Sequence, residues 1–216
     1  MSLKVVLKKL FKAVMTIPMV ISGLVTRTHK GISYKLVYGT VDQLVMGYAF
    51  DPSLQKKATI GLAQLGGAFA TVTTQEQIDE ICQQMINAGK KPQADITRYL
   101  SKPGYGIVLV KDFLKDFNRK EMKAIYYHEL GHLVNGDLSG NPTGLVVDLD
   151  KELAADAYAV KYTDAKTMHS VLDKLCKNIF ERFAPIVTSE EMAVIKEEFF
   201  GVNGIMTKRL AALQAM

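Results

Sequence analysis

The feature that most constrains this chain of 216 residues is a pair of histidines, His128 and His132, placed four residues apart. Residues with this spacing lie on the same side of an α-helix, one turn from each other. Asn118 and Glu121 have the spacing of a capping box before the pair, and Asn135-Gly136 is a helix stop after it. We therefore predict a helix of about four to five turns that presents both imidazoles on one face.

Two imidazoles so placed can bind one metal ion, and Glu129 beside them can stay free of that ion. Zinc accepts nitrogen and carboxylate ligands in near-tetrahedral geometry, and catalytic zinc sites keep one position for water. The ion lowers the pKa of this water from about 15.7 to about 7, so Glu129 is the candidate general base for hydrolysis. The alternative is that both histidines are ordinary core or surface residues.

A catalytic zinc ion normally has a third protein ligand. A third histidine in an extended motif is excluded, because Asn135 occupies its glycine position and Leu138 its last histidine position. Glu152 is the candidate instead, since residues 151–163 are rich in helix formers and can form a second helix. The rival third ligands are Asp148, Asp150 and His169.

This second helix can be capped by Asp148 or Asp150. Asp156 follows Glu152 by one turn on the same face, where it could accept the outer N–H of a liganding histidine and fix its tautomer. Alternatively, Glu152 is a solvated first-turn glutamate and Asp156 a surface residue. Gly131, which costs about 1 kcal/mol inside a helix, predicts an element packed closely against its turn.

The motif at 128–132, followed by Glu152 and Asp156, resembles the gluzincin zinc peptidases. It is similar to short HExxH peptidases of bacteria and bacteriophages, and to the catalytic cores of the HtpX/Ste24-type and ImmA-type families. The similarity covers about residues 104–165 and is weaker towards the C-terminus. The resemblance implies zinc bound by His128, His132 and Glu152, with Glu129 as the general base.

The same resemblance implies a side chain that stabilises the oxyanion formed during hydrolysis. The candidates are Tyr158, Tyr162, His169 and Arg209, although residues of these types are more often packing or surface residues. It also implies that residues 104–110, an apolar run that predicts a strand, form the sheet edge beside the cleft. A substrate peptide could pair with such an edge. The alternative is an interior strand.

The rest of the pattern predicts an α+β, helix-dominated, zincin-like domain with a small sheet packed on the motif helix. Residues 32–50 are expected to contain one or two strands, and residues 137–147 a loop near the metal. Further helices are predicted at 73–88, after a second capping box, and at 165–183, 189–200 and 204–214.

The net charge of +5 is unevenly distributed. Residues 1–30 contain six basic and no acidic side chains, whereas residues 31–216 contain 21 basic and 22 acidic ones. This distribution excludes a general nucleic-acid-binding domain. We interpret residues 1–30 as a basic amphipathic segment attached to a metallopeptidase-like domain at 31–216.

Three interpretations of the N-terminal segment stay open. It could be a signal peptide, an amphipathic helix on a membrane surface or assembly partner, or a helix packed on its own domain. Its apolar run is shorter than the about 20 residues that span a membrane. We therefore expect a cytoplasmic or virion-associated protein, with peripheral membrane association through this segment as a further option.

The function expected from the sequence is hydrolysis of peptide bonds in protein or peptide substrates by a zinc-dependent peptidase. One alternative is a catalytically silent relative that serves as a structural or binding component of a larger assembly, such as a phage particle. Another is a regulator that cleaves one specific partner.

Overall fold

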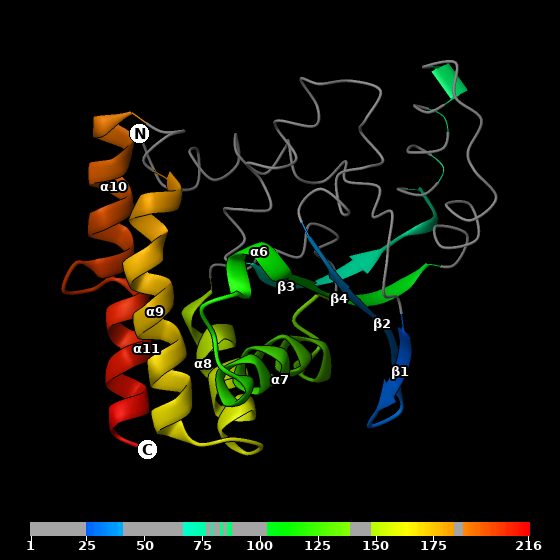
Figure 1. The fold of residues 1–216 in the computed structure, drawn as a ribbon, viewed down its shortest axis with the longest axis horizontal. Helices are drawn as coiled ribbons and strands as arrows, with labels where there is room; N and C mark the ends of the chain where they lie inside the picture. The colour runs from blue at the N-terminus through cyan, green and yellow to red at the C-terminus, as the bar shows by residue number, and fades with distance from the viewer. Residues whose placement is uncertain are drawn as a thin grey trace.

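The computed structural model of the protein describes residues 25–40, 67–76, 103–138, 148–183 and 188–216, and positions 79, 83, 86 and 87. These residues form the predicted α+β fold, in which helices cover a small mixed sheet (Figure 1). The strands are β1 (Val25–His29), β2 (Ile32–Gly39), β3 (Ala68–Thr73) and β4 (Gly104–Val110). The helices are α6 (Lys111–Leu114), α7 (Arg119–Asn135), α8 (Leu149–Val160), α9 (Ala165–Phe183), α10 (Ser189–Phe200) and α11 (Ile205–Gln214).

The strand β4 is predicted correctly, but its expected place at the sheet edge is wrong. The strand order is β1-β2-β4-β3, with β4 parallel to β2 and antiparallel to β3. From Gly106 to Val110 every residue of β4 is buried. A continuous apolar strand of this kind is covered on both faces and has strands on both sides, so the interior alternative is the right one.

The strands β1 and β3 were not foreseen from the sequence. β1 pairs with β2 through a hairpin whose two turn residues, Lys30 and Gly31, have φ values of 47° and 80°. Positive φ at both positions is the type I′ turn that matches strand twist. β1 is exposed over Val25–Thr28 and lacks an apolar alternation that could reveal it. Residues 1–24 of the N-terminal segment lie outside the described residues.

The predicted helices at 165–183 and 189–200 are confirmed as α9 and α10, and that at 204–214 as α11, which begins one residue later. In the predicted helix at 73–88, the described positions from 75 onward are helical, whereas Thr73 ends β3. Most of the predicted loop at 137–147 and residues 41–50 lie outside the described residues. None of the helices in the described ranges is long and apolar enough to cross a membrane.

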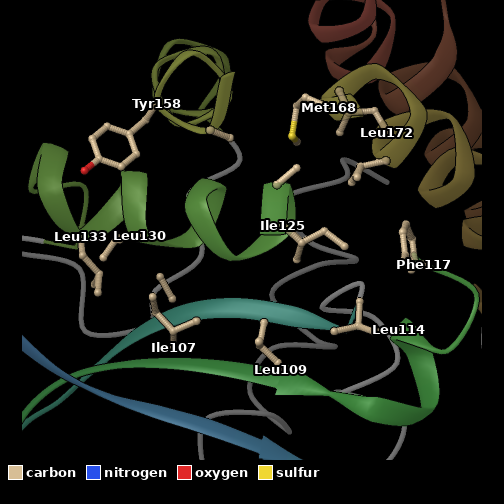
Figure 2. Close-up of a cluster of buried hydrophobic side chains, with 14 of the residues drawn as sticks. Ile107, Leu109, Leu114, Phe117, Ile125, Leu130, Leu133, Tyr158, Met168 and Leu172 are labelled. Carbon is tan, nitrogen blue, oxygen red and sulfur yellow. The ribbon is translucent and has the colours of Figure 1, made fainter. Parts of the chain in front are cut away.

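Helix α7 lies between the sheet and the helices α8 and α9 (Figure 2). Ile107 and Leu109 of β4 belong to one buried cluster with Ile125 of α7 and Met168 of α9. A Cβ atom on Gly131 would lie 3.0 Å from the Cα atom of Ala155, which confirms the predicted close neighbour. This contact brings the middle of α8 against the motif turn of α7.

Candidate metal centre

Both ends of α7 are defined by the predicted caps. The side chain of Asn118 accepts hydrogen bonds from the backbone of Lys120 and Glu121, and the carboxylate of Glu121 accepts one from Asn118 N. At the other end Gly136 is left-handed, and its N–H donates to the Leu133 carbonyl. The motif thus lies in the C-terminal half of a well-bounded helix of 17 residues, with His132 in its last turn.

Helix α7 is also tied to α9 through the buried carboxylate of Glu121. Ser170 Oγ donates to Oε1 at 2.7 Å, and Lys174 Nζ donates to Oε2 at 2.8 Å. Burial by itself would raise the pKa of Glu121, but the hydrogen bonds from Lys174, Asn118 and Ser170 lower it below its ordinary value. This ion pair anchors the helix about two turns before the histidines.

The structure brings the side chains of His128, His132 and Glu152 together. The Nε2 atoms of the two histidines are 3.2 Å apart. Glu152 Oε2 lies 3.4 Å from His128 Nε2, and Oε1 lies 3.5 Å from His132 Nε2. A tetrahedral zinc ion with bonds of about 2.0–2.1 Å requires ligand atoms about 3.3–3.4 Å apart. The two Nε2 atoms, and one Glu152 oxygen beside each of them, are therefore close to the spacing that such an ion needs.

The rival third ligands are placed elsewhere. Asp148 caps α8 by accepting a hydrogen bond from Asp150 N, and both side chains are exposed. His169 on α9 has its Nε2 atom 3.3 Å from Gln214 Nε2 of α11. Within the described ranges, the His128, His132 and Glu152 group is the one with metal-ligand spacing.

Each histidine has a carboxylate beside its outer ring nitrogen. His128 Nδ1 is 2.8 Å from Asp156 Oδ1, as predicted, although the N–H direction is poorly aligned for a hydrogen bond. His132 Nδ1 is hydrogen-bonded to Asp137 Oδ2 at 2.9 Å. A carboxylate in this position fixes the tautomer and leaves Nε2 free for a metal. Both imidazoles therefore present Nε2 to the centre of the cluster.

Asp137 was missed in the sequence, although a local signal for it exists. Its backbone N–H donates to the His132 carbonyl at 3.0 Å, and Gly136 N–H donates to the Leu133 carbonyl. These two bonds form a Schellman motif, which folds the residue after the glycine back over the last helical turn. A histidine at the third position before such a cap thus predicts contact with the residue that follows the glycine.

Arg209 of α11 contacts two carboxylates of α8, those of Glu152 and Asp156. Its Nη1 atom is 2.6 Å from Glu152 Oε2, while Nε and Nη2 donate to the two oxygens of Asp156 at 2.7 Å. Burial alone would raise the pKa of both carboxyl groups, but the charge of Arg209 and the contact with His128 lower it. The pKa of Glu152 falls to about 2, and that of Asp156 lies well below its ordinary value.

Negative charge exceeds positive charge in the buried cluster. Four carboxylates, those of Glu129, Asp137, Glu152 and Asp156, surround the imidazoles, against the single buried guanidinium of Arg209 among the described residues. Burial lowers the pKa of His128, but contacts with Asp156 and Glu152 outweigh this and raise it to about 10. A divalent cation bound here would offset this surplus of negative charge, and it would compete with the proton on His128.

Glu129 is 8% exposed and directly follows His128 on α7. Burial lowers the pKa of Arg209, but the charges of Glu152 and Asp156, followed by that of Glu129, raise it. Its role as the base stays a prediction.

The tyrosine candidates for oxyanion stabilisation have other partners. The hydroxyl of Tyr158 is 2.6 Å from His29 Nε2 of β1 and 3.3 Å from the hydroxyl of Tyr162. The side chains of His29 and Tyr162 also make an edge contact. This group ties the β1–β2 hairpin to α8, and the identity of an oxyanion stabiliser stays open among Tyr158, Tyr162, His169 and Arg209.

Comparison with protein-family models, curated proteins and solved structures gives no significant match to this chain. The function therefore has to be inferred from the arrangement of the residues. That arrangement provides two imidazoles with a Glu152 oxygen 3.4 Å or 3.5 Å from each, a carboxylate beside each outer ring nitrogen, and the buried side chain of Glu129 next to His128.

Proposed function

We propose that the protein is a zinc-dependent peptidase in which His128, His132 and Glu152 bind the ion and Glu129 is the general base. The observation that carries the proposal is the donor spacing of 3.2–3.5 Å between the two Nε2 atoms and the Glu152 carboxylate. Two imidazoles and a carboxylate form a donor set that zinc prefers, whereas Ca²⁺ and Mg²⁺ favour oxygen ligands alone.

When bound, the zinc ion would activate a water molecule and polarise the scissile carbonyl. Glu129 would accept a proton from the attacking water and pass it to the nitrogen of the leaving amine. The C–N bond breaks, the water oxygen stays on the acyl fragment, and Glu129 returns to its ionised form. The burial of Glu129 directly beside His128 supports this role.

A peptide substrate would need a surface beside this site. Extended peptides can pair with an exposed strand edge. Within the described sheet the edge strands are β1 and β3, and β3 is the one that packs against α7. The expectation of substrate pairing therefore moves from β4 to the edge of Ala68–Thr73.

The test compares Glu129→Gln with His132→Ala. The glutamine variant should bind zinc like the wild type but lose hydrolysis by about 10²–10⁴-fold, since it cannot accept the proton. The alanine variant should lose zinc itself. Zinc content is measured by atomic emission, and cleavage by mass spectrometry of a digested peptide library. Unaltered activity of Glu129→Gln would contradict the assigned base.

Two results would favour the alternatives. Zinc bound at one ion per chain without cleavage of any peptide supports a catalytically silent component of an assembly. Cleavage of one native partner with no action on the library supports a specific regulator.

A further inference from the structure

The side chain of Arg209 is buried on a helix that lies outside the motif. Its helix α11 buries Met206, Arg209 and Leu213 on one face and packs on α8 and α9. The arginine is 8% exposed. A buried cation is tolerated only when it is paired and hydrogen-bonded, and here both requirements are met by Glu152 and Asp156.

The two carboxylate oxygens of Glu152 have different partners. Oε2 lies 3.4 Å from His128 Nε2 and Oε1 lies 3.5 Å from His132 Nε2. Only Oε2 also receives a charge-assisted contact from Nη1 of Arg209, at 2.6 Å. The Nε and Nη2 atoms of the same guanidinium grip Asp156 in the planar, two-bonded form that arginine prefers. The orientation of the Glu152 carboxylate is therefore coupled to that of the carboxylate beside His128.

We propose that Arg209 is a positioning residue that engages Glu152 Oε2 and so restricts Glu152 to one-oxygen coordination of the metal through Oε1. A carboxylate without this partner is free to bind an ion through both oxygens. Coordination by one oxygen and two imidazoles leaves the fourth tetrahedral position for water. The inference rests on the zinc site proposed above but does not require that the site cleaves peptides.

A direct role of Arg209 in binding the oxyanion predicts a different outcome. Three of its nitrogens each contact a carboxylate oxygen of α8. As an oxyanion donor, Arg209 would affect turnover and leave zinc affinity and coordination unchanged. As a positioning residue, it affects zinc binding in the absence of any substrate.

The experiment measures binding of zinc, by competition with a chromophoric chelator, to wild type, Arg209→Lys and Arg209→Met. Lysine keeps the charge but not the planar fork. We expect both variants to bind zinc about 10–100-fold more weakly, the usual cost of losing a partner of a metal ligand. If Arg209 acted on zinc only through its positive charge, Arg209→Lys would bind zinc like the wild type. Arg209→Met would then bind zinc more tightly, because a nearby positive charge is removed.

A second readout reports the geometry. Cobalt(II) in the same site absorbs more strongly in the visible when four-coordinate than when five- or six-coordinate. The wild type should give the strong spectrum, and both Arg209 variants the weaker spectrum of a higher coordination number. A structural defect elsewhere in the chain would leave this spectrum unaltered.

The matched control is Lys174→Met, which removes a buried-carboxylate partner at Glu121, away from the metal ligands. It should lower stability while keeping wild-type zinc affinity and cobalt spectrum. If Arg209→Met does not fold, Arg209→Lys still decides the question. Wild-type zinc affinity and cobalt spectrum in Arg209→Lys would overturn the proposal. Weakened binding together with an absence of peptidase activity in the wild type would uphold the inference and reject the peptidase.

Discussion

The two histidines of α7 have the same kind of outer partner, but the chain supplies these partners in different ways. His132 contacts Asp137, five residues later, through the turn that ends its own helix. His128 contacts Asp156 of α8, which is itself held by Arg209 of α11. One orientation thus depends on a local turn, and the other on the packing of three helices. The two sides of the site should therefore respond differently to equivalent substitutions.

The largest effect is expected on the His128 side. Asp156→Asn removes the negative charge that lies beside His128. It also leaves the guanidinium of Arg209 without its two-bonded carboxylate partner. Zinc affinity should fall by about 100-fold, at the upper end for such partners. The metal-free protein should lose about 3–5 kcal/mol of unfolding free energy, the cost of breaking a buried pair. Chelator competition and urea unfolding measure the two quantities, and unchanged zinc affinity would refute the role of Asp156.

The equivalent change on the His132 side should have a smaller effect. Asp137→Asn keeps the backbone bond from Asp137 N to the His132 carbonyl and leaves no buried cation unpaired. Zinc affinity should fall by about 10-fold. The unfolding free energy should change by about 1 kcal/mol or less. The same two assays apply, and a loss of stability as large as that of Asp156→Asn would abolish the contrast between the two sides.

A third change tests whether helix packing sets the position of Glu152. In Gly131→Ala the new Cβ atom would lie 3.0 Å from Ala155 Cα and 3.1 Å from Tyr158 Cβ. Overpacking costs about 1–3 kcal/mol, and the better helix propensity of alanine returns about 1 kcal/mol. We expect a net loss of about 1 kcal/mol and a several-fold weaker zinc affinity, because α8 is pushed away from the histidines.

The control for this third change is Gly31→Ala in the β1–β2 turn, where no atom lies within 4 Å but φ is positive. It should lower stability through backbone strain and leave zinc affinity as in the wild type. Equal zinc affinity in both glycine variants would mean that the α7–α8 contact does not position Glu152.

The smallest effect on the metal is expected at the far end of α7. Glu121→Gln should keep wild-type zinc affinity but lose about 1–3 kcal/mol of stability at pH 7, through its lost charged hydrogen bonds. The folded pKa of Glu121 lies below its ordinary value of 4.5, so its contribution is complete above about pH 4.5 and is lost as the pH falls through the folded pKa. Urea unfolding at pH 7 and pH 3 should therefore show a smaller difference between the two proteins at pH 3.

Some parts of this fold were predictable because their signals are local. The caps at Asn118 and Gly136 bound α7 as predicted, and α9, α10 and α11 follow their apolar spacing and stop signals. The strands β1 and β3, of five and six residues, were missed because short strands carry little pattern of their own, and β1 is also exposed over Val25–Thr28. The interior place of β4 depends on its neighbours β2 and β3, so it could not be derived from residues 104–110 alone.

The candidate metal centre also has one part that local sequence signals predict and another that depends on tertiary packing. The amino-acid order alone places two imidazoles and the carboxylate of Glu129 on one capped helix, because helical spacing and capping act over a few residues. Only the folded chain shows which candidate third ligand lies beside the two imidazoles. It is Glu152, rather than Asp148, Asp150 or His169. The folded chain was also required for the pairing of Arg209 with Glu152 and Asp156 of α8. These contacts join residues that are distant in sequence, and they exist because the close approach at Gly131 and the packing of α11 on α8 bring the helices together.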